Sequence, residues 1–257
     1  MYLNLILPII LSLYSFKESP LSLIETNKDQ ISKSISFSIS KTSLIKIYLV
    51  ANKNLTFNCG CSFNLKKEID IKSCNYLPRN KTNKRSRKLE FEHIVPTFTL
   101  GNNLRCWKKP ICQKKNKKQF KGRQCCKRIS TKFIKMEADM HNLFPSIGEV
   151  NGDRSNYRFG EIPNENRSYG QCDFEVFDKT AEPKESIRGD IARSYFYMSQ
   201  KYKIPISESY ENLLIRWNIL DPPDVWERDR NSLIEKVQGN RNPFIDNPEK
   251  VELVIDF

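Results

Sequence analysis

Residues 136–161 read MEADMHNLFPSIGEVNGDRSNYRFGE, and this stretch is the most informative part of the chain about the fold. Residues 133–152 look helical, but Pro145 divides them because proline cannot continue a helix. We expect a new turn or short helix to begin at Ser146, with Gly152 available to end it. The segment also holds asparagines that matter for the chemistry below, namely Asn142, Asn151 and Asn156.

Upstream, residues 89–96 read LEFEHIVP and contain one of the two histidines of the chain, His93, directly after Glu92. Apolar and polar residues alternate here, which predicts a strand that ends at Pro96. Taken alone, a histidine at a strand end is more often a structural hydrogen-bonding group than a base. A neutral imidazole is nevertheless a good general base at neutral pH, so the pair needs support from the rest of the chain.

Working outward, the N-terminal half predicts a helix at 40–50, a short β-prone segment at 56–61 and a long basic loop from 101 to about 129. The C-terminal third predicts three helices. The first has one apolar face and Ser186 as a candidate cap, the second covers 207–220, and the third covers about 223–238 and ends at Gly239. The inward residues we predict are Ile187, Ile191, Tyr195 and Met198, then Leu213, Leu214 and Trp217, then Val225, Leu233, Ile234 and Val237. The fold class is therefore α+β, with a small β part early and helices late.

The chain is strongly basic, with a formal net charge of +13 in 257 residues. Thirteen Lys or Arg and no acid lie between residues 102 and 135, and seven more lie between 71 and 88, again without an acid. These two runs flank the LEFEHIVP segment. Such clustering indicates a polyanionic partner, although a disordered basic loop would look similar.

The first 16 residues and the cysteines together indicate export. Residues 2–16 carry no charge and are too short to span a bilayer, so we predict a signal peptide at 1–16 and one domain at 17–257. The eight cysteines suggest up to four disulfides in the periplasm or outside the cell. Their C-x-C and C-C spacings do not fit a zinc ribbon.

The residue types around the Glu92–His93 pair suit attack on a phosphodiester. No serine elbow, phosphate-binding glycine loop or H-E-x-x-H motif competes with this hypothesis. A base would deprotonate water, a hard divalent cation would neutralise charge on the phosphate, and an arginine would steady the products. Mg²⁺ needs only one or two protein oxygens, which directs attention to the three asparagines named above.

The segments EFEHIVP, MEADMHNLFPSIGEVNGDRSNYRFGE, RGDIARSYFYM and QGNRNPFI, in that order, resemble the bacterial endonuclease I family. The resemblance implies an exported, disulfide-bonded, non-specific nuclease with a ββα-metal (His-Me finger) core that leaves 5′-phosphate ends. We expect it to act on DNA and also on RNA. It implies that His93 is the general base, that Glu92 and Asn151 bind Mg²⁺ (Mn²⁺ or Ca²⁺ are alternatives), and that Arg123 stabilises the cleaved phosphate.

This chain departs from the family pattern in a longer, lysine-rich segment, a basic insertion at about 107–122. We expect Cys112 to pair with Cys125 and Cys106 with Cys126, which leaves two bridges among Cys59, Cys61, Cys74 and Cys172. Residues expected to bind nucleic-acid phosphates are Lys88, Arg105, Lys121 and Arg128. We further expect a monomer without stable membrane association.

Two other functions remain open at this point. One is a metal-free ribonuclease that uses His93 and His141 as an acid–base pair. The other is an exported polyanion-binding protein without catalysis. For His141 a structural role beside Asp139 is the favoured interpretation, and the aromatic residues of RSYFYM (193–198) are expected in the core.

Overall fold

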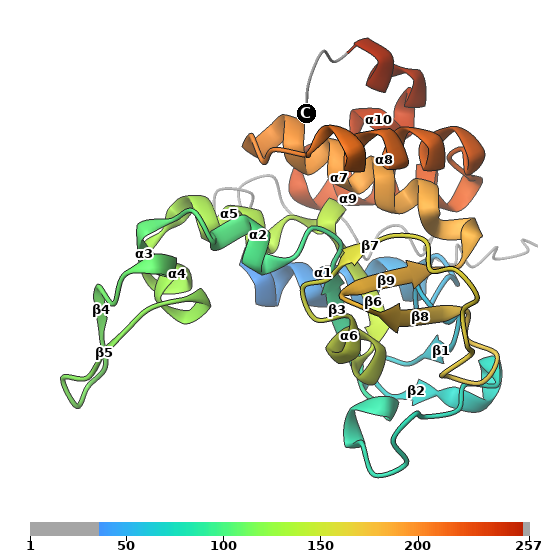
Figure 1. Cartoon of the computed structure of the whole chain (residues 1–257), viewed down its shortest axis with the longest axis horizontal. Helices are drawn as coiled ribbons and strands as arrows, with labels where there is room; N and C mark the ends of the chain where they lie inside the picture. The colour runs from blue at the N-terminus through green and yellow to red at the C-terminus, as the bar shows by residue number, and fades with distance from the viewer. Residues whose placement is uncertain (1–35, 254–257) are drawn as a thin grey trace, which may run out of the picture.

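The computed structural model describes residues 36–253, and it confirms the α+β class (Figure 1). The predicted signal peptide at 1–16 lies outside the described residues. Among the described residues, none of the helices has the length and apolar character needed to cross a membrane.

A pair of antiparallel strands, β3 (Leu89–His93) and β6 (Leu143–Ile147), is followed directly by α6 (Gly148–Arg154). The register sets His93 opposite Leu143 and Leu89 opposite Ile147, so α6 starts beside the first residues of β3. The predicted strand at LEFEHIVP and the short helix around Asn151 are therefore both present. Together they form a ββα unit near the middle of the molecule (Figure 1).

The helical interpretation of 133–152 is wrong at its centre. Helix α5 (Thr131–Ala138) ends early, and Pro145 lies inside strand β6 rather than at a helix break. The carbonyl of Pro145 accepts from the backbone N–H of Phe57 (2.7 Å), on the edge away from β3. In an antiparallel strand, the N–H and C=O of one residue point to the same side. The position of the N–H that Pro145 lacks therefore faces away from β3, so no hydrogen bond between β3 and β6 is lost.

The segment from 101 to 129 is ordered rather than the predicted loop. It contains the helices α3 (Arg105–Lys108) and α4 (Arg123–Ile129) and between them a hairpin of β4 (Cys112–Gln113) and β5 (Gln119–Phe120). Two disulfides, Cys106–Cys126 and Cys112–Cys125, cross-link this segment as expected. Cross-links supply order where few apolar side chains are present, and composition alone does not show this.

The remaining cysteines form the bridges Cys59–Cys172 and Cys61–Cys74, which completes the four predicted disulfides. Residues 56–61 form a turn, not the predicted β segment, because Thr56 Oγ1 accepts from Cys61 N (2.9 Å) and Gly60 adopts φ +70°. Smaller β elements follow. They are β1 (Ser62–Phe63) with β2 (Ile69–Asp70), and a three-stranded sheet in the order β7 (Arg158–Phe159), β9 (Thr180–Pro183), β8 (Phe174–Phe177).

The C-terminal helices form a layer over the ββα unit and the three-stranded sheet (Figure 1). They are α7 (Arg188–Tyr202), α8 (Glu208–Leu220), α9 (Val225–Gln238) and the short α10 (Pro243–Asp246). Two details of the prediction are wrong. Ser186 does not cap α7, whose N-cap is Ile187 without a side-chain hydrogen bond, and Val225 is 76% exposed because it is the first residue of α9.

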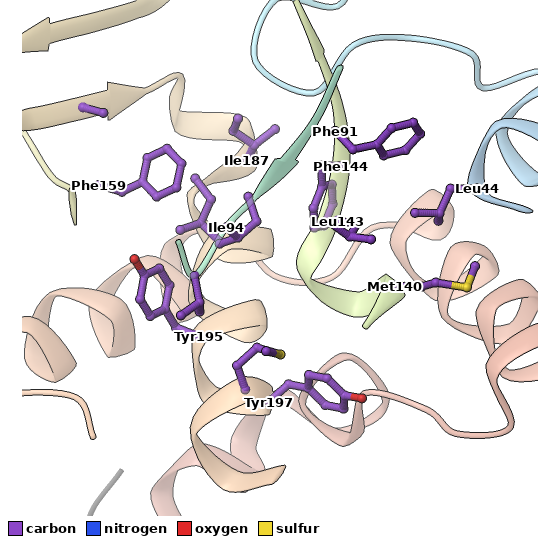
Figure 2. Packing of buried hydrophobic residues seen from close by; sticks show 14 of the residues in the cluster. Leu44, Phe91, Ile94, Met140, Leu143, Phe144, Phe159, Ile187, Tyr195 and Tyr197 are labelled. Carbon is purple, nitrogen blue, oxygen red and sulfur yellow. The ribbon is translucent and has the colours of Figure 1, made fainter. Parts of the chain in front are cut away.

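The main core lies between the ββα unit and the helices. Figure 2 shows Phe91 of β3 and Phe144 of β6 among buried side chains from α7 and from α1 (Phe37–Val50). Tyr195 and Tyr197 are buried, so the prediction that the aromatic residues of 193–198 belong to the core is confirmed. The short α2 (Thr97–Gly101) begins three residues after the end of β3.

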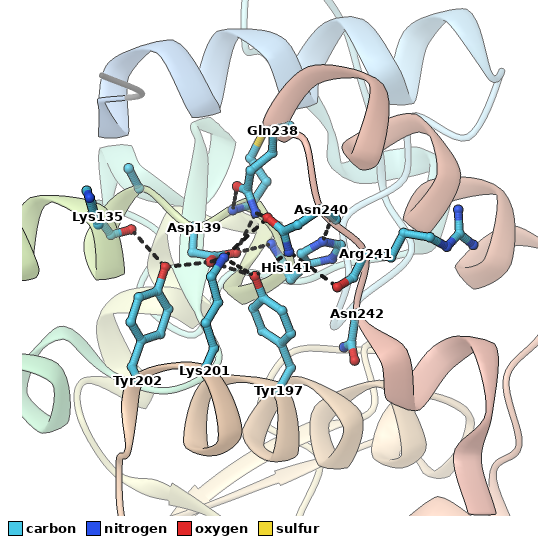
Figure 3. Close-up of polar contacts among 12 residues, drawn as sticks. Lys135, Asp139, His141, Tyr197, Lys201, Tyr202, Gln238, Asn240, Arg241 and Asn242 are labelled. Atoms are coloured by element: carbon cyan, nitrogen blue, oxygen red, sulfur yellow. Dashed lines mark hydrogen bonds and ion pairs between the residues drawn. The ribbon is translucent and has the colours of Figure 1, made fainter. Parts of the chain in front are cut away.

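His141 belongs to a buried polar network centred on Asp139 (Figure 3). Asp139 Oδ2 accepts from Tyr197 Oη (2.8 Å), Lys201 Nζ (2.8 Å) and Tyr202 Oη (2.7 Å), and its Oδ1 accepts from Gln238 Nε2 (2.9 Å). The imidazole of His141 donates through Nε2 to the carbonyl of Asn240 (3.0 Å). The network joins the segment before β6 to α7 and α9, which gives His141 the structural role favoured by the sequence.

This environment predicts an acid-sensitive fold. Burial lowers the pKa of His141 from 6.5 to about 4, despite the opposing charge of Asp139. The folded protein keeps His141 neutral, whereas the unfolded chain protonates it below about pH 6.5, so unfolding takes up a proton between these values. Stability is therefore complete above about pH 6.5 and is lost as the pH falls towards 4.

We expect the free energy of unfolding in urea to fall by roughly 2 kcal/mol between about pH 7 and about pH 5 from this group. His141→Gln, which keeps a donor for Asn240, should reduce that pH dependence. Unchanged pH dependence in the variant would contradict the assignment.

Candidate active site

A cavity of about 610 Å³ opens where β3 and α6 meet α1, α2 and α4. Its walls combine aromatic, cationic and amide side chains. The lining residues are Phe37, Lys41, Lys67, Leu89, Glu90, Phe91, His93, Pro96, Thr97, Phe98, Trp107, Arg123, Asn151, Arg154, Ser155 and Asn156. Three residues singled out in the sequence, His93, Arg123 and Asn151, therefore reach the same cavity although up to 58 positions separate them along the chain.

The hydrogen bond made by His93 determines which nitrogen is free. His93 Nε2 lies 2.9 Å from the backbone carbonyl of Glu137, and a carbonyl only accepts, so Nε2 carries the proton. Nδ1 then keeps its lone pair. Burial, together with the nearby charges of Arg123 and Arg154, lowers the pKa of His93 to about 3 in spite of that hydrogen bond. The imidazole is thus neutral at neutral pH and can accept a proton at Nδ1.

Glu137 also holds Arg123. Arg123 is the first residue of α4, and its Nε donates to Glu137 Oε1 (2.7 Å). The carboxylate of Glu137 is 2% exposed, whereas the side chain of Arg123 is 38% exposed. The buried carboxylate therefore holds a guanidinium that solvent can reach. Lys127 Nζ lies 3.7 Å from the other oxygen of Glu137. Glu137 was not identified from the sequence, because its partners lie on other elements.

On the other side of β3, Glu90 organises the amide of Asn151. Asn151 Nδ2 donates to Glu90 Oε2 (2.8 Å), and Arg85 holds both oxygens of the same carboxylate at 2.8 and 2.7 Å. The two glycines of α6 make room for this arrangement. A Cβ on Gly148 would lie 2.8 Å from Glu90 Oε1, and one on Gly152 would collide with the guanidinium of Arg85. With its nitrogen bound, Asn151 keeps its amide oxygen for another partner.

Glu92 lies on the same strand face as Glu90, but it is fully buried and does not line the cavity. It accepts from Asn58 Nδ2 (2.7 Å), and its Oε1 lies 3.6 Å from Arg154 Nε. Burial raises the pKa of Glu92, against the charge of Arg154 and the hydrogen bond from Asn58. Among the described residues, Glu92 Oε1 has no hydrogen-bond partner, which is unusual for a buried carboxylate.

Asn142 is engaged elsewhere. Its Oδ1 accepts from Val95 N (2.7 Å) and its Nδ2 donates to Val95 O (3.0 Å), so both ends of the amide fix the chain after β3. Asn156 lines the cavity together with Asn151. Of the three asparagines raised by the sequence, two therefore reach the cavity.

Like charges converge around the cavity. Burial lowers the pKa of Lys41, and the nearby charges of Lys67, Lys127 and Arg123 lower it further. The ring of Phe37 lies beneath three of these cations, with Lys41 Nζ 4.5 Å from its centroid. A bound anion would relieve this repulsion, which makes the cavity suited to a phosphate. The four residues predicted to bind phosphates, Lys88, Arg105, Lys121 and Arg128, are exposed but lie outside the cavity lining.

A family model described as Endonuclease I matches residues 12–249. The chain belongs to the endonuclease I family. It is 40% identical over 232 residues to a periplasmic deoxyribonuclease of Aeromonas hydrophila, a match that covers 88% of this chain and 92% of the relative. It is 41% identical over 216 residues to an extracellular deoxyribonuclease of the same species, covering 82% of this chain and 87% of the relative.

Membership of the endonuclease I family makes the chain an endonuclease, a phosphodiester hydrolase. An extracellular ribonuclease of Bacillus subtilis (strain 168) is also similar, at 35% identity over 130 residues, 43% of this chain and 44% of that protein. The periplasmic and extracellular relatives and the four disulfides agree with the predicted periplasmic or secreted location.

A second group of acids lies apart from the cavity lining. Ligand atoms of Glu165, Asp173 and Glu175 lie within 4.8 Å of one another. Arg167 contacts all three carboxylates, so a guanidinium already compensates their charge. The group has no role in the site described above.

Proposed function

We propose that this chain is a divalent-metal-dependent, non-specific endonuclease that cleaves DNA and RNA and leaves 5′-phosphate ends. The observation that carries the proposal is the cavity itself. It joins an imidazole that keeps Nδ1 as an acceptor, a guanidinium on a buried carboxylate, and an asparagine whose amide oxygen has no hydrogen-bond partner within residues 36–253. The cations around these groups supply attraction for a polyanion.

Each residue has a chemical role in this proposal. His93 accepts a proton from the attacking water at Nδ1, and Glu137 keeps the ring in the required tautomer. Arg123 binds the phosphate oxygens and stabilises the charge that builds on them. Glu92 and Asn151 would hold the metal ion. When bound, the ion would neutralise charge on the phosphate as a Lewis acid.

The donor set fits such an ion. Magnesium prefers a few carboxylate and amide oxygens and keeps waters for its remaining positions. Glu92 contributes a buried oxygen that has no hydrogen-bond partner in the described part of the chain, and Asn151 contributes an amide oxygen that Glu90 orients by binding the nitrogen. Calcium and manganese also accept oxygen donors, so the ligands alone do not select one ion.

The same geometry supports a lack of sequence specificity. The side chains that face the cavity are suited to phosphates, and contacts to phosphates carry no base information. The names of the relatives include both deoxyribonucleases and a ribonuclease, which supports a substrate range that spans DNA and RNA.

Removal of metal is the direct test. We expect the purified protein to nick supercoiled plasmid and to cleave RNA with Mg²⁺, to lose both activities in EDTA, and to regain them when Mg²⁺ is added in excess. Labelling of the products by polynucleotide kinase only after phosphatase treatment would report 5′-phosphate ends. Full activity on RNA alone in EDTA would instead favour a metal-free ribonuclease, and salt-sensitive binding without cleavage would favour a polyanion-binding protein.

A further inference from the structure

The hairpin β4–β5 projects from the body of the molecule as a separate arm (Figure 1). We define the basic arm as residues 108–121. Its turn is closed by backbone hydrogen bonds between Lys114 and Lys118 and between Lys117 and Lys114. Successive strand residues rise about 3.3 Å, so the turn lies about 10 Å beyond Cys112.

Both ends of the arm meet the wall of the cavity. Trp107 directly precedes the arm and Arg123 follows two residues after it, and both side chains line the cavity. Gly122 N donates to Cys106 O (3.0 Å), which closes the base of the arm. A strand of nucleic acid with a phosphate at Arg123 therefore has the arm as its neighbour on one side.

The arm is held in place relative to the cavity. Cys112 of β4 is bonded to Cys125 of α4, and Arg128 of α4 donates to the carbonyl of Gln113 (2.7 Å). Cys125 and Cys126 are both completely buried. A cross-linked support of this kind loses less entropy when the arm binds a partner than a free loop would.

The arm exposes cations without any acid. Lys114, Lys115, Lys117, Lys118 and Lys121 are all exposed, and no Asp or Glu occurs between residues 102 and 135. A cleft of about 560 Å³ lies between the arm and α4, with Ile111 and Ile129 in its walls beside Lys114, Lys115 and Arg128. Its chemistry, cations with a small apolar surface, matches a sugar–phosphate backbone.

We infer that the basic arm is a second nucleic-acid contact that binds phosphates next to the one being cleaved. This inference rests on the proposed nuclease function and adds a binding surface to it. The arm contributes attraction and takes no part in the chemical step. It therefore lowers KM for long substrates and leaves kcat unchanged.

The test compares two triple variants of equal charge. The arm variant is Lys114→Gln, Lys115→Gln, Lys118→Gln, and the matched control is Lys179→Gln, Lys203→Gln, Lys236→Gln. All six lysines are exposed and none lines the cavity. Binding to a duplex is measured in EDTA over a range of salt concentrations, with both triples placed in the His93→Ala protein. Cleavage of plasmid is measured with both triples in the wild-type protein.

We expect the slope of log affinity against log salt to become shallower by about 2 to 3 units in the arm variant, and to stay near the parent value in the control. KM should rise and kcat should remain unchanged. Equal slopes in both triples would overturn the inference, since the lysines would then be merely solvated.

A membrane surface is the other partner that lysines beside exposed isoleucines could fit. Vesicles of phosphatidylcholine and phosphatidylglycerol test it. If the arm variant loses binding to these vesicles but not to the duplex, the nucleic-acid contact is wrong. If the parent protein cleaves plasmid but the salt slopes of the two triple variants are equal, only the arm contact is contradicted. If the parent protein does not cleave, the proposed nuclease function is contradicted, and the role of the arm with it.

Discussion

The His93→Ala protein is expected to cleave supercoiled plasmid about 10²- to 10⁴-fold more slowly than the wild type at saturating Mg²⁺. The reason is that the cavity holds one imidazole with a free nitrogen, placed by the carbonyl of Glu137. The neighbouring arginine and lysines remain, so affinity for a duplex should stay within a few-fold of the wild type. The measurement is the initial nicking rate, with binding followed by fluorescence anisotropy in EDTA.

His141→Gln is the matched control, because it removes the other histidine without touching the cavity. A wild-type nicking rate in the His93→Ala protein would exclude His93 as the base. An equally large loss of RNA cleavage in the His141→Gln protein, measured in EDTA at a temperature where that protein is folded, would support the histidine-pair ribonuclease instead.

The second large effect concerns the oxygen donors. Asn151→Ala and Glu92→Gln should each weaken Mg²⁺ binding by at least about 10-fold and reduce cleavage by a similar or greater factor, because each removes one expected ligand. Titration calorimetry with Mg²⁺ alone measures the affinity without any substrate. The His93→Ala protein should bind the ion like the wild type, which separates loss of metal from loss of the base.

Glu90→Gln separates a ligand from a residue that only positions one. Glu90 touches the cavity, whereas Glu92 lies behind it, so the two carboxylates are direct competitors for the metal. If Glu90 acts through Asn151, the Glu90→Gln substitution should weaken Mg²⁺ binding by at most about 100-fold. The double variant with Asn151→Ala should then bind Mg²⁺ only slightly more weakly than Asn151→Ala alone. Loss of binding in Glu90→Gln together with full binding in Glu92→Gln would reassign the ligand to Glu90.

Local patterns predicted much of the fold. The helices α7, α8 and α9 carry apolar faces and strong stop signals, and Gly239 indeed ends α9 in the left-handed region at φ +84°. The two disulfides that hold the segment around the arm were expected, but its short helices and hairpin were not, because they have no hydrophobic periodicity. Strand β6 was missed since Pro145 is compatible with a strand only when its missing N–H faces a free edge, and sequence does not show edges.

For the site, motifs identified His93, Arg123 and Asn151, and the structure places all three at one cavity. The supporting residues Glu90, Glu137 and Arg85 were not identified. Each makes its contact across elements: Glu90 accepts from Asn151, 61 positions away, and Glu137 accepts from Arg123 of another helix. A single sequence gives no signal for such pairs unless covariation among relatives is available.

Glu137 gives the site an internal alignment. Its main-chain carbonyl accepts from the imidazole of His93, and its side chain accepts from the guanidinium of Arg123. One residue therefore anchors both the proposed proton acceptor and the proposed phosphate-binding group. A small shift of α5 would move both groups in the same direction and leave their separation nearly constant. In the proposed mechanism, this shared anchor would keep the water activated by His93 at a nearly constant distance from a phosphate bound by Arg123, without any need for the whole cavity to be rigid.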